Sequence, residues 1–381
     1  MFNWFLYPLV EYDSIFNIFQ YITFRAIYAA VTALMISYFT GPHIIRLLTR
    51  MKFGQNVRED GPSTHLSKQG TPTMGGLLMI ISVIISTLMW QNFTSYYTWV
   101  LIFALLAFGT LGFIDDYLKI KKRNSDGVSA RIKSGGQIII STILTFLLFM
   151  RSSEFYKVLK LSGPGEFGGQ EISLIYIPLL KSLAVDLGWF YIPFGIILLV
   201  GTSNATNLTD GLDGLLTGLL IWAFGTFAII AYVSGHSFFA SYLHIPYIPE
   251  ASELTVPIMA ILGSCIGFLW YNSHPAEVFM GDTGSLSFGG VLGLLAMMLK
   301  RELLLIIIGG VFVMETLSVI IQVLYFRYTK KKYGEGRRVF LMAPLHHHYE
   351  KKSWAETKVV TRFWILGSLF SLIALSTLKI N

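Results

Sequence analysis

The chain has 381 residues, of which 54% are hydrophobic and only 13% are charged. This charged fraction is about half that of a typical soluble domain, and one soluble core cannot bury so much apolar surface. The net charge of +7 does not indicate nucleic-acid binding, because basic residues are not interleaved with aromatic ones and zinc-finger spacing is absent. The single cysteine, Cys265, lies in an apolar run, so neither an intrachain disulfide nor redox chemistry is expected. We therefore expect an integral membrane protein.

Long apolar runs predict the membrane-spanning helices. A hydrocarbon core about 30 Å thick requires about 20 apolar residues in a helix. The predicted fold class is therefore an all-α polytopic membrane protein with about ten transmembrane helices, forming a single domain over residues 1–381. The ten runs, bounded by charged residues or by Pro and Gly clusters, lie at 23–48, 73–91, 97–114, 135–150, 191–206, 213–233, 256–271, 284–299, 303–326 and 360–379.

Ten spans place both termini on one side of the membrane and divide the connecting segments into two sets. One set contains nineteen Lys and Arg residues, whereas the other set and both tails together contain six. Because positively charged segments stay in the cytoplasm, we predict external termini and cytoplasmic catalytic loops in the cell inner (cytoplasmic) membrane. The predicted cytoplasmic segments are 49–72, 115–134, 207–212, 272–283 and 327–359.

The longest outward segment covers residues 151–190. It contains GPGEFGG followed by EISLIYIPLL. Gly-rich turns and β-branched residues favour strands and tight connections, so a small hairpin over the outer face is predicted here.

Every dense polar motif falls in the predicted cytoplasmic set. Asp115 and Asp116 directly follow an apolar run, where an ionised carboxylate is costly unless it is paired or coordinated. A solvated helix end would explain one such acid. Two adjacent carboxylates, followed by Lys119 and three further basic residues, indicate a functional site instead.

The segment NATNLTDGLDG carries four amide and carboxylate side chains between two predicted spans. Asp210 and Asp213 are three residues apart and, with Asn204 and Asn207 before them, could share one inward helix face. A polar turn in which Asp and Gly act as caps is the alternative. Capping does not explain so many polar groups beside a bilayer, so a substrate-binding role is predicted.

Asp282 lies in FMGDTGS, a Gly-rich turn that opens the next predicted helix. Free backbone N–H groups at such a turn suit a phosphate, and the carboxylate suits a hard cation. Capping of the helix is the rival explanation. Upstream, Lys68, Thr71 and Thr73 could form an anion cradle beside a Gly pair, although the segment does not match a Walker sequence.

Three adjacent histidines, His346, His347 and His348, stand in the motif MAPLHHHYE. Adjacent side chains diverge, and the i, i+4 spacing of a helical zinc pair is absent, so zinc is not expected. A solvated histidine cluster is the alternative to the favoured role, which is binding of a phosphate or a lipid head group.

Dispersed aspartates beside cations, amides and Gly turns suit one kind of chemistry. Mg²⁺ typically uses one or two carboxylates together with substrate phosphates. Phosphoryl transfer depends on neutralising and aligning charge more than on covalent chemistry. A site at the membrane boundary implies one lipid-borne substrate and one soluble substrate, so we predict an Mg²⁺-dependent enzyme that joins them.

The motifs GTPTMGG, DDYLK, NATNLTDGLDGL, FMGDTGS and MAPLHHHYE, in this order, closely resemble those of the phospho-N-acetylmuramoyl-pentapeptide transferases, the MraY family. This family belongs to the polyprenyl-phosphate N-acetylhexosamine-1-phosphate transferases, and the resemblance covers nearly the whole chain. It implies transfer of phospho-MurNAc-pentapeptide from UDP-MurNAc-pentapeptide to undecaprenyl phosphate, with Mg²⁺ at the cytoplasmic face. The products would be lipid I and UMP, in peptidoglycan synthesis for cell-wall growth and division. Homodimerisation is a further family expectation.

The resemblance also implies the roles of individual residues. Asp282 is the leading Mg²⁺ ligand, and Asp115 and Asp116 are the catalytic acidic pair, either of which could deprotonate or position the lipid phosphate. Transfer is either direct or passes through a phospho-aspartate. The implied substrate-binding residues are Lys68, Thr73, Lys119, Lys133, Asn204, Asn207, Asp210, Asp213, Asn272, Phe279, Gly281, His346, His347 and His348.

Other functions are open to the same residues. A sibling enzyme that transfers N-acetylglucosamine-1-phosphate to the same lipid would share the acidic motifs, whereas MAPLHHHYE favours the muramoyl enzyme. A transporter predicts acidic residues near the middle of spans, and here they are expected at span ends. An intramembrane aspartyl protease requires a partner YD span that the sequence lacks, and a scaffold leaves the clustering of polar motifs unexplained.

Overall fold

The computed structural model describes residues 2–51, 70–122, 127–151, 172–178 and 180–379, and most of these residues are helical. Short 3₁₀ helices cover Tyr7–Glu11, Ser14–Gln20 and Gly188–Phe190, and the strands are β1 (Leu174–Ile177) and β2 (Leu180–Asp186). The α-helices are α1 (Phe2–Phe5), α2 (Ile22–Arg50), α3 (Gly76–Trp90), α4 (Tyr96–Lys122), α5 (Ala130–Phe149), α7 (Tyr191–Thr209), α8 (Leu215–Ser234), α9 (Ser237–Leu243), α10 (Ala251–Asn272), α11 (Gly281–Met298), α12 (Leu304–Ile308), α13 (Gly310–Tyr333), α14 (Leu345–Lys351) and α15 (Glu356–Ser376).

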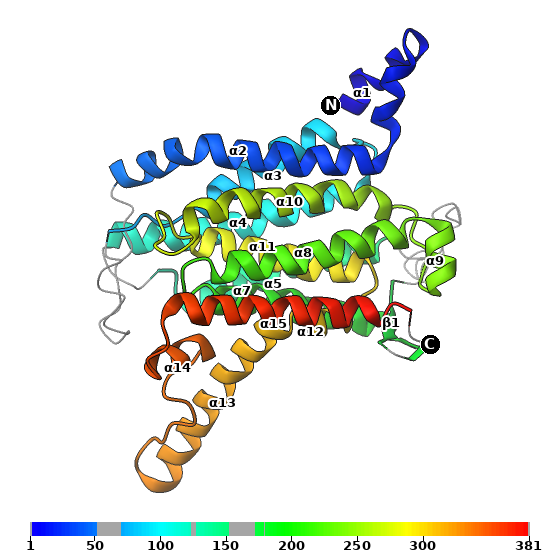
Figure 1. The fold of residues 1–381 in the computed structure, drawn as a ribbon. Helices are drawn as coiled ribbons and strands as arrows, with labels where there is room; N and C mark the ends of the chain where they lie inside the picture. The colour runs from blue at the N-terminus through cyan, green and yellow to red at the C-terminus, as the bar shows by residue number, and fades with distance from the viewer. Residues whose placement is uncertain (1, 52–69, 123–126, 152–171, 179, 380–381) are drawn as a thin grey trace.

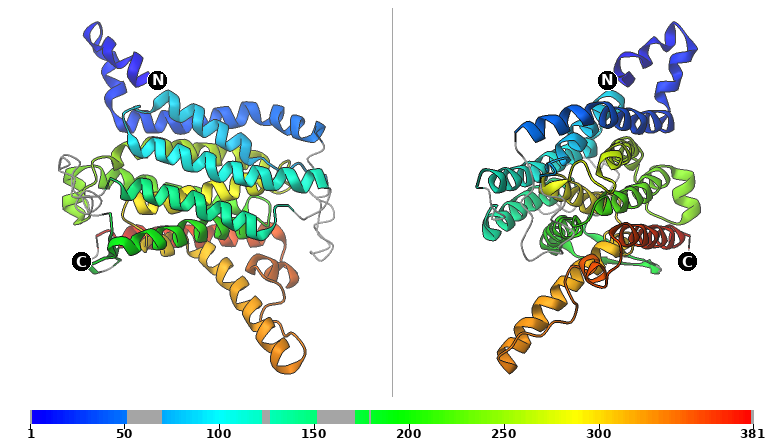
Figure 2. Two further views of the ribbon diagram at one scale, coloured as in Figure 1. Left: turned by 180° about the vertical axis from the view of Figure 1, so that it is seen from behind. Right: turned by 60° about the vertical axis from the view of Figure 1, so that its left-hand side comes forward.

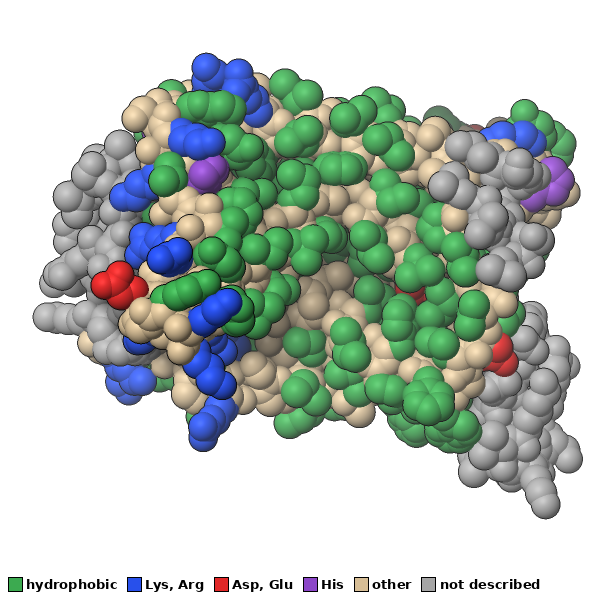
Figure 3. Space-filling view, turned by 90° about the horizontal axis from the view of Figure 1, so that it is seen from below, with side chains coloured by type: hydrophobic (Ala, Val, Ile, Leu, Met, Phe, Trp, Pro, Cys, Tyr) green, Lys and Arg blue, Asp and Glu red, His purple; other side chains and the backbone are tan. Residues whose placement is uncertain are grey.

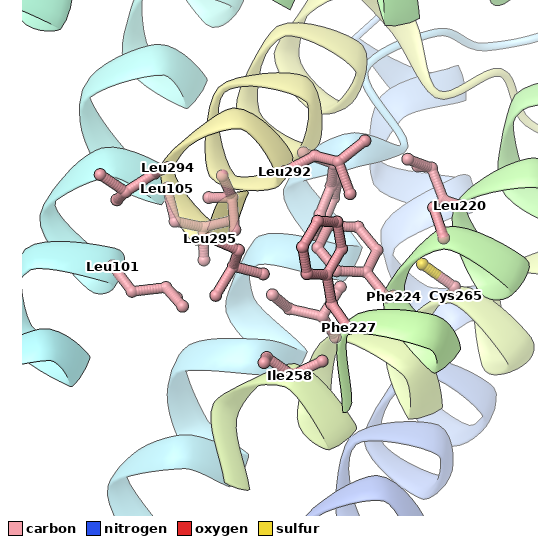
Figure 4. Packing of buried hydrophobic residues seen from close by; sticks show 14 of the residues in the cluster. Leu101, Leu105, Leu220, Phe224, Phe227, Ile258, Cys265, Leu292, Leu294 and Leu295 are labelled. Atoms are coloured by element: carbon pink, nitrogen blue, oxygen red, sulfur yellow. The ribbon is translucent and has the colours of Figure 1, made fainter. Parts of the chain in front are cut away.

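The long helices lie side by side in one bundle, with α11 at its centre (Figure 1). α11 packs against α4 and α7, while α10 packs against α2 and α8. Every residue from 283 to 298 is buried, because protein surrounds α11 on all sides. Phe224 of α8 meets Phe288 of α11 edge to face, with ring centroids 6.2 Å apart. Figure 4 shows Leu292 and Leu295 of α11 in the same apolar core.

Eight helices of the described residues are long and apolar enough to cross a membrane. Large apolar side chains are exposed along the bundle, and Figure 3 shows them in a broad zone beside an end where Lys and Arg gather. This distribution is that of a polytopic membrane protein. The eight helices are Ile22–Arg50, Tyr96–Lys122, Ala130–Phe149, Gly188–Thr209, Leu215–Ser234, Ala251–Asn272, Gly310–Tyr333 and Glu356–Ser376.

Two of the ten predicted spans correspond to helices outside this set. The run at 73–91 forms α3, which has only 15 residues. The run at 284–299 forms α11, whose Gly residues and Asp282 lower its mean hydropathy. A helix enclosed by protein does not need the apolar surface that lipid requires, so composition alone identifies eight spans.

The predicted span at 303–326 is not continuous. α12 ends at Ile308 and α13 begins at Gly310, where two successive glycines weaken the helix. Beyond the break, α13 leans away from the bundle, and the chain folds back from its far end to α14, as Figures 1 and 2 both show. The start of α2 and the end of α15 lie at the same end of the bundle (Figure 1).

The predicted hairpin is present between α5 and α7. Strands β1 and β2 pair in antiparallel fashion, with Leu174 opposite Asp186 and Ile175 opposite Val185. The connection follows Pro178 and is not the Gly-rich turn expected, because GPGEFGG lies outside the described residues. Cys265 is free and buried, as its position in an apolar run predicts.

Candidate active site

Two adjacent carboxylates lie near the end of α4. The side chains of Asp115 and Asp116 are buried, with residue exposures of 2% and 3%. The helix continues to Lys122, so the two acids lie within its last turns and not after its end. One turn later, Lys119 Nζ is 2.7 Å from Asp115 Oδ2, and this ion pair offsets part of the cost of burial.

Asp116 binds the start of α11. Its carboxylate accepts hydrogen bonds from the backbone N–H groups of Asp282 at 3.2 Å and Thr283 at 2.9 Å. The Thr283 hydroxyl donates a third bond at 2.8 Å. We expected these N–H groups to be free for a substrate phosphate, and this expectation was wrong. A carboxylate of the chain itself occupies the positive end of the helix.

Gly281 is required where α11 begins. Its φ of +74° lies in the left-handed region, which favours glycine. A Cβ atom at this position would lie 2.7 Å from Asp116 Oδ2 and 2.8 Å from Thr73 Oγ1. The turn therefore brings the predicted residues Thr73 and Gly281 close to the acidic pair.

Asp282 is the meeting point of two lysines. Lys119 Nζ lies 2.8 Å and Lys133 Nζ 2.6 Å from Asp282 Oδ2. Lys133 is also 3.4 Å from Asp115 Oδ2, and the Val128 backbone N–H donates to Asp115 Oδ1 at 2.7 Å. The start of α5, the end of α4 and the start of α11 are thereby joined by alternating charges.

The end of α7 completes this cluster. Asn207 donates its amide hydrogens to Asp282 Oδ1 at 2.7 Å and to Ser285 Oγ at 2.9 Å. Asn204 lies one turn earlier and donates to Gln137 and to the Val200 carbonyl instead. Of the two predicted asparagines, only Asn207 therefore has a recorded hydrogen bond to Asp282.

The predicted helical ladder through Asp210 and Asp213 is wrong. α7 ends at Thr209, and Asp213 lies in the turn that follows, because the Asp and Gly residues end the helix. Burial and the negative charges of Asp282 and Asp116 raise the pKa of Asp210 to about 8, although the Gly281 N–H opposes the shift. At neutral pH this carboxyl is mostly protonated and can donate a hydrogen bond.

Asp213 takes part in a different group. Its Oδ2 accepts from the Ala276 backbone N–H at 3.1 Å and lies 3.1 Å from His274 Nδ1. Glu356 accepts from the Asp213 N–H at 2.9 Å. Within the described residues, Asp213, His274 and Glu356 place possible metal-ligand atoms within 4.8 Å of one another. This mixed nitrogen and oxygen group differs from the all-carboxylate set around Asp282.

The loop before α11 is tied to the segment before α3. The Phe279 N–H donates to the Pro72 carbonyl, and its own carbonyl accepts from the Gly75 N–H, both at 2.8 Å. Asn272 is buried, accepts from the Thr217 hydroxyl and donates to the Val278 carbonyl. The Asn272 amide thus links the loop to α8. Lys68 lies outside the described residues.

The three histidines have different hydrogen-bonding neighbours, but they do not all diverge as the sequence predicted, because the ring centroids of His346 and His347 are 4.2 Å apart. His346 is buried, with Nδ1 3.2 Å from Glu315 Oε1. His347 Nδ1 is 2.7 Å from Glu350 Oε2, and His348 accepts from the Leu341 N–H. A Cβ at Gly211 would collide with His346 Nε2, so α14 reaches the turn after α7.

Sequence reasoning overlooked several residues that hold the site. Glu315 is fully buried inside α13, and a lone acid in an apolar run is the signal that indicates such a residue. Thr283 and Ser285 belong to the motif FMGDTGS, in which only Phe279, Gly281 and Asp282 were selected. Gln137, which binds Ser203 and Asn204, had no distinguishing pattern, because its role depends on a neighbouring helix.

The arrangement suits a phosphorylated substrate. Two lysine amines beside carboxylates can neutralise phosphate oxygens, and the carboxylates can bind a hard cation. Fold and site together define a polytopic membrane protein whose polar site, at the ends of several spans, is suited to phosphoryl chemistry.

Comparison with known proteins agrees with this class. The glycosyl transferase family 4 profile matches residues 98–300, and signature 1 of the phospho-N-acetylmuramoyl-pentapeptide-transferases matches residues 68–80. The chain is 47% identical to the phospho-N-acetylmuramoyl-pentapeptide-transferase of Thermodesulfovibrio yellowstonii and 48% identical to that of Rickettsia prowazekii, over 99% of each chain. It is 50% identical to the Borreliella burgdorferi enzyme over 95% of this chain and 97% of the relative. The chain belongs to the phospho-N-acetylmuramoyl-pentapeptide-transferase family.

Proposed function

We propose that the protein transfers phospho-MurNAc-pentapeptide from UDP-MurNAc-pentapeptide to undecaprenyl phosphate, giving lipid I and UMP. Family membership supports the choice of substrates. The observation that carries the chemistry is the convergence of Lys119 and Lys133 on one oxygen of Asp282. Two cations and a carboxylate at one point suit a diphosphate better than a neutral sugar.

The proposed reaction exchanges one phosphoanhydride bond for another. An oxygen of the lipid phosphate attacks the phosphorus that carries the sugar, and a new P–O bond forms. The bond from this phosphorus to the oxygen bridging it to UMP breaks, and UMP leaves with the bonding electrons. Lys119 and Lys133 lie where they can turn from Asp282 to the phosphate oxygens and stabilise their charge.

Mg²⁺ fits the donor set that we assign to it. Asp115, Asp116 and Asp282 offer carboxylate oxygens, which are the hard ligands that this ion prefers. Asp282 is the most accessible of the three, with 14% of its side chain exposed against 3% and 4%. We therefore assign Asp282 as the leading ligand. When bound, the ion would supply positive charge to the diphosphate oxygens.

The contacts suggest different roles for the acidic pair. Asp116 is engaged by three donors of α11, so we assign it to positioning Asp282. Asp115 faces both lysines and is the better candidate to accept a proton from the lipid phosphate or to orient it. This assignment favours direct transfer, with the lipid phosphate as the nucleophile.

The remaining predicted residues are assigned to the substrates. Asp210, with Asn207 beside it, would bind the nucleotide end, together with the loop that carries Phe279. His346 and its neighbours in α14 would bind the phosphate or sugar side. Lys68, Thr73, Asn204, Asp213, Asn272, Gly281, His347 and His348 keep the substrate-binding roles implied by the family.

The proposed setting is a bacterial inner membrane. The end of the bundle that carries the site would face the cytoplasm, both termini would be external, and residues 1–381 would act as one domain and pair as a homodimer. The positively charged end of the molecule in Figure 3 supports this orientation.

Product identification tests the proposal. Detergent-solubilised protein is incubated with undecaprenyl phosphate, Mg²⁺ and either UDP-MurNAc-pentapeptide or UDP-N-acetylglucosamine, and the lipid products are identified by mass spectrometry. We expect lipid I from the first donor only, and no product with Asp282→Asn. Product from UDP-N-acetylglucosamine alone would identify the sibling transferase, and no product from either donor would overturn the proposal.

A further inference from the structure

A second polar site lies at the other end of α11. The carboxylate and lysine cluster is at the first turn of this helix, whereas a cavity of about 190 Å³ lies beyond its last turn. The 18 residues of α11 separate the two by about 27 Å. The walls of the cavity come from β1, the segment after α9, the connection from α11 to α12, and the end of α15, all at the right of Figure 1.

Two cations line this cavity, the buried Lys300 and the partly buried Arg301, and a single acid accompanies them. Lys300 is only 3% exposed and donates to Glu302 Oε1 at 2.6 Å and to the Ile172 carbonyl at 2.7 Å. Tyr191 donates its hydroxyl hydrogen to the same Glu302 oxygen. Glu302 has one further buried oxygen without a partner among the described residues. One carboxylate therefore faces two positive charges.

Arg301 is the cation left without a recorded partner. Its Nε and Nη2 atoms are buried and form no hydrogen bond with the part of the chain that the structure describes. Burial lowers the pKa of Arg301 to about 10 and also lowers the pKa of Lys300. Buried guanidinium nitrogens without acceptors are costly, and an anion in the cavity would satisfy them.

The backbone around the cavity is also unusual. Lys300, just after α11, has a φ of +56°, and His244, just after α9, has a φ of +52°. The left-handed region costs a non-glycine residue roughly 1–2 kcal/mol, and helices usually place glycine there. Two helices that end at this cavity therefore present a lysine and a histidine where glycine would be less strained. Strain of this kind concentrates at ligand-binding positions.

We propose that this cavity binds an anionic phosphate group, with the Arg301 guanidinium as its principal ligand. The planar guanidinium donates paired hydrogen bonds that match phosphate oxygens. The cavity is smaller than the roughly 300–1,000 Å³ of pockets for drug-sized ligands, so it admits a head group and not a nucleotide sugar. It lies where α11 ends and α15 finishes, at the end of the bundle opposite the carboxylate cluster, and the ends of spanning helices lie at the level of lipid head groups. A free phosphate compound shares this chemistry.

Native mass spectrometry of the purified full chain tests the proposal. The probes are dioleoylphosphatidylglycerol, dioleoylphosphatidylcholine and inorganic phosphate. We expect one saturable phosphatidylglycerol site that Arg301→Gln weakens about 10-fold or more. The matched control is Arg46→Gln, which removes an exposed cation near the other end of the bundle and should leave the affinity unchanged. If inorganic phosphate competes with phosphatidylglycerol, the site binds phosphate groups in general. If it does not compete, the site is specific for a lipid head group.

Transferase activity reports whether the variants fold, because Arg301 lies far from the carboxylate cluster. If Arg301→Gln is inactive, Arg301→Lys decides the question, since lysine keeps the charge but cannot reproduce the guanidinium fork. A loss of affinity of three-fold or more in Arg301→Lys would support the proposal. Unchanged affinity in the active variant, or no saturable binding of either phosphatidylglycerol or phosphate to the wild type, would overturn it.

Discussion

Asp116 accepts two hydrogen bonds from Thr283, one from the backbone N–H at 2.9 Å and one from the hydroxyl at 2.8 Å. The pair fastens the last turns of α4 to the first turn of α11 and places a carboxylate at the positive end of that helix. Asp282 is the residue just before Thr283, so its position depends on this contact.

Replacing Asp116 should therefore lower the stability of the protein as well as its turnover. Asp116→Asn replaces the charged carboxylate that accepts from the α11 N–H groups with a neutral amide, which has only one acceptor oxygen. We expect a loss of about 1–3 kcal/mol in unfolding free energy. Thr283→Val removes only the hydroxyl and should have a smaller effect. Thermal denaturation in detergent measures both. An Asp116→Asn variant with wild-type stability and low turnover would point to a purely chemical role.

The Mg²⁺ dependence of turnover should require the carboxylate of Asp282. Asp282→Asn nearly preserves side-chain volume but removes the charge that would hold Mg²⁺, so turnover should collapse while the protein still folds and inserts. Titrating activity against Mg²⁺ measures the effect, and Zn²⁺ should substitute poorly because oxygen ligands dominate the site. If Asp282→Asn shows near-normal turnover with an unchanged Mg²⁺ optimum, Asp282 is not the metal ligand.

Asp115 and Asp210 should fail in different ways. Asp115→Asn should lower turnover by several orders of magnitude with nucleotide affinity within a few fold, because its role belongs to the transition state. Asp210→Ala should instead weaken nucleotide binding. Losing one hydrogen bond to a charged group costs about 1.5–3 kcal/mol, or roughly 10- to 150-fold in affinity. Equilibrium titration and saturated turnover separate the two, and a reversed pattern would contradict the scheme.

Glu315 should support catalysis through His346. Glu315→Ala removes the buried carboxylate that accepts the His346 backbone N–H and lies beside its ring, and leaving a buried donor unsatisfied costs about 1–3 kcal/mol. Both melting temperature and turnover should fall. Glu253→Ala is the matched control, since it breaks the Arg25–Glu253 pair elsewhere and should lower only the melting temperature. Equal turnover in the two variants would show that Glu315 is structural alone.

Topology reporters test the orientation. Fusions in the segments 115–134 and 327–359 should read as cytoplasmic, and fusions in 151–190 should read as external. The expectation rests on the excess of Lys and Arg in the first set, nineteen against six. The opposite pattern would place the site of Asp282 on the outer face and exclude the proposed substrates.

The sequence alone predicted the class of membrane protein, most of the spans and the acidic residues of the cluster. The length of an apolar run and the clustering of charged residues are local properties, so they can be recognised without the fold. Asp115, Asp116 and Asp282 were selected in this way, and the structure joins them. Sequence could not show that Asp116 would occupy the N–H groups of α11, since that contact crosses 167 positions of the chain. It misjudged the Asp210 and Asp213 ladder for a local reason, the end of α7 at Thr209.

Only the tertiary structure decided which polar groups face one another. Lys133 and Asn207 reach Asp282 because α5 and α7 pack beside each other, and Glu315 meets His346 because α14 folds back from α13. Arg301 lies between two predicted spans, and only the tertiary structure shows that it shares a cavity with the hairpin and the end of α15. Hydrophobic periodicity determines which side of a helix is buried, but the partner of a buried charge depends on which helix packs against it, and that choice is made by the whole bundle.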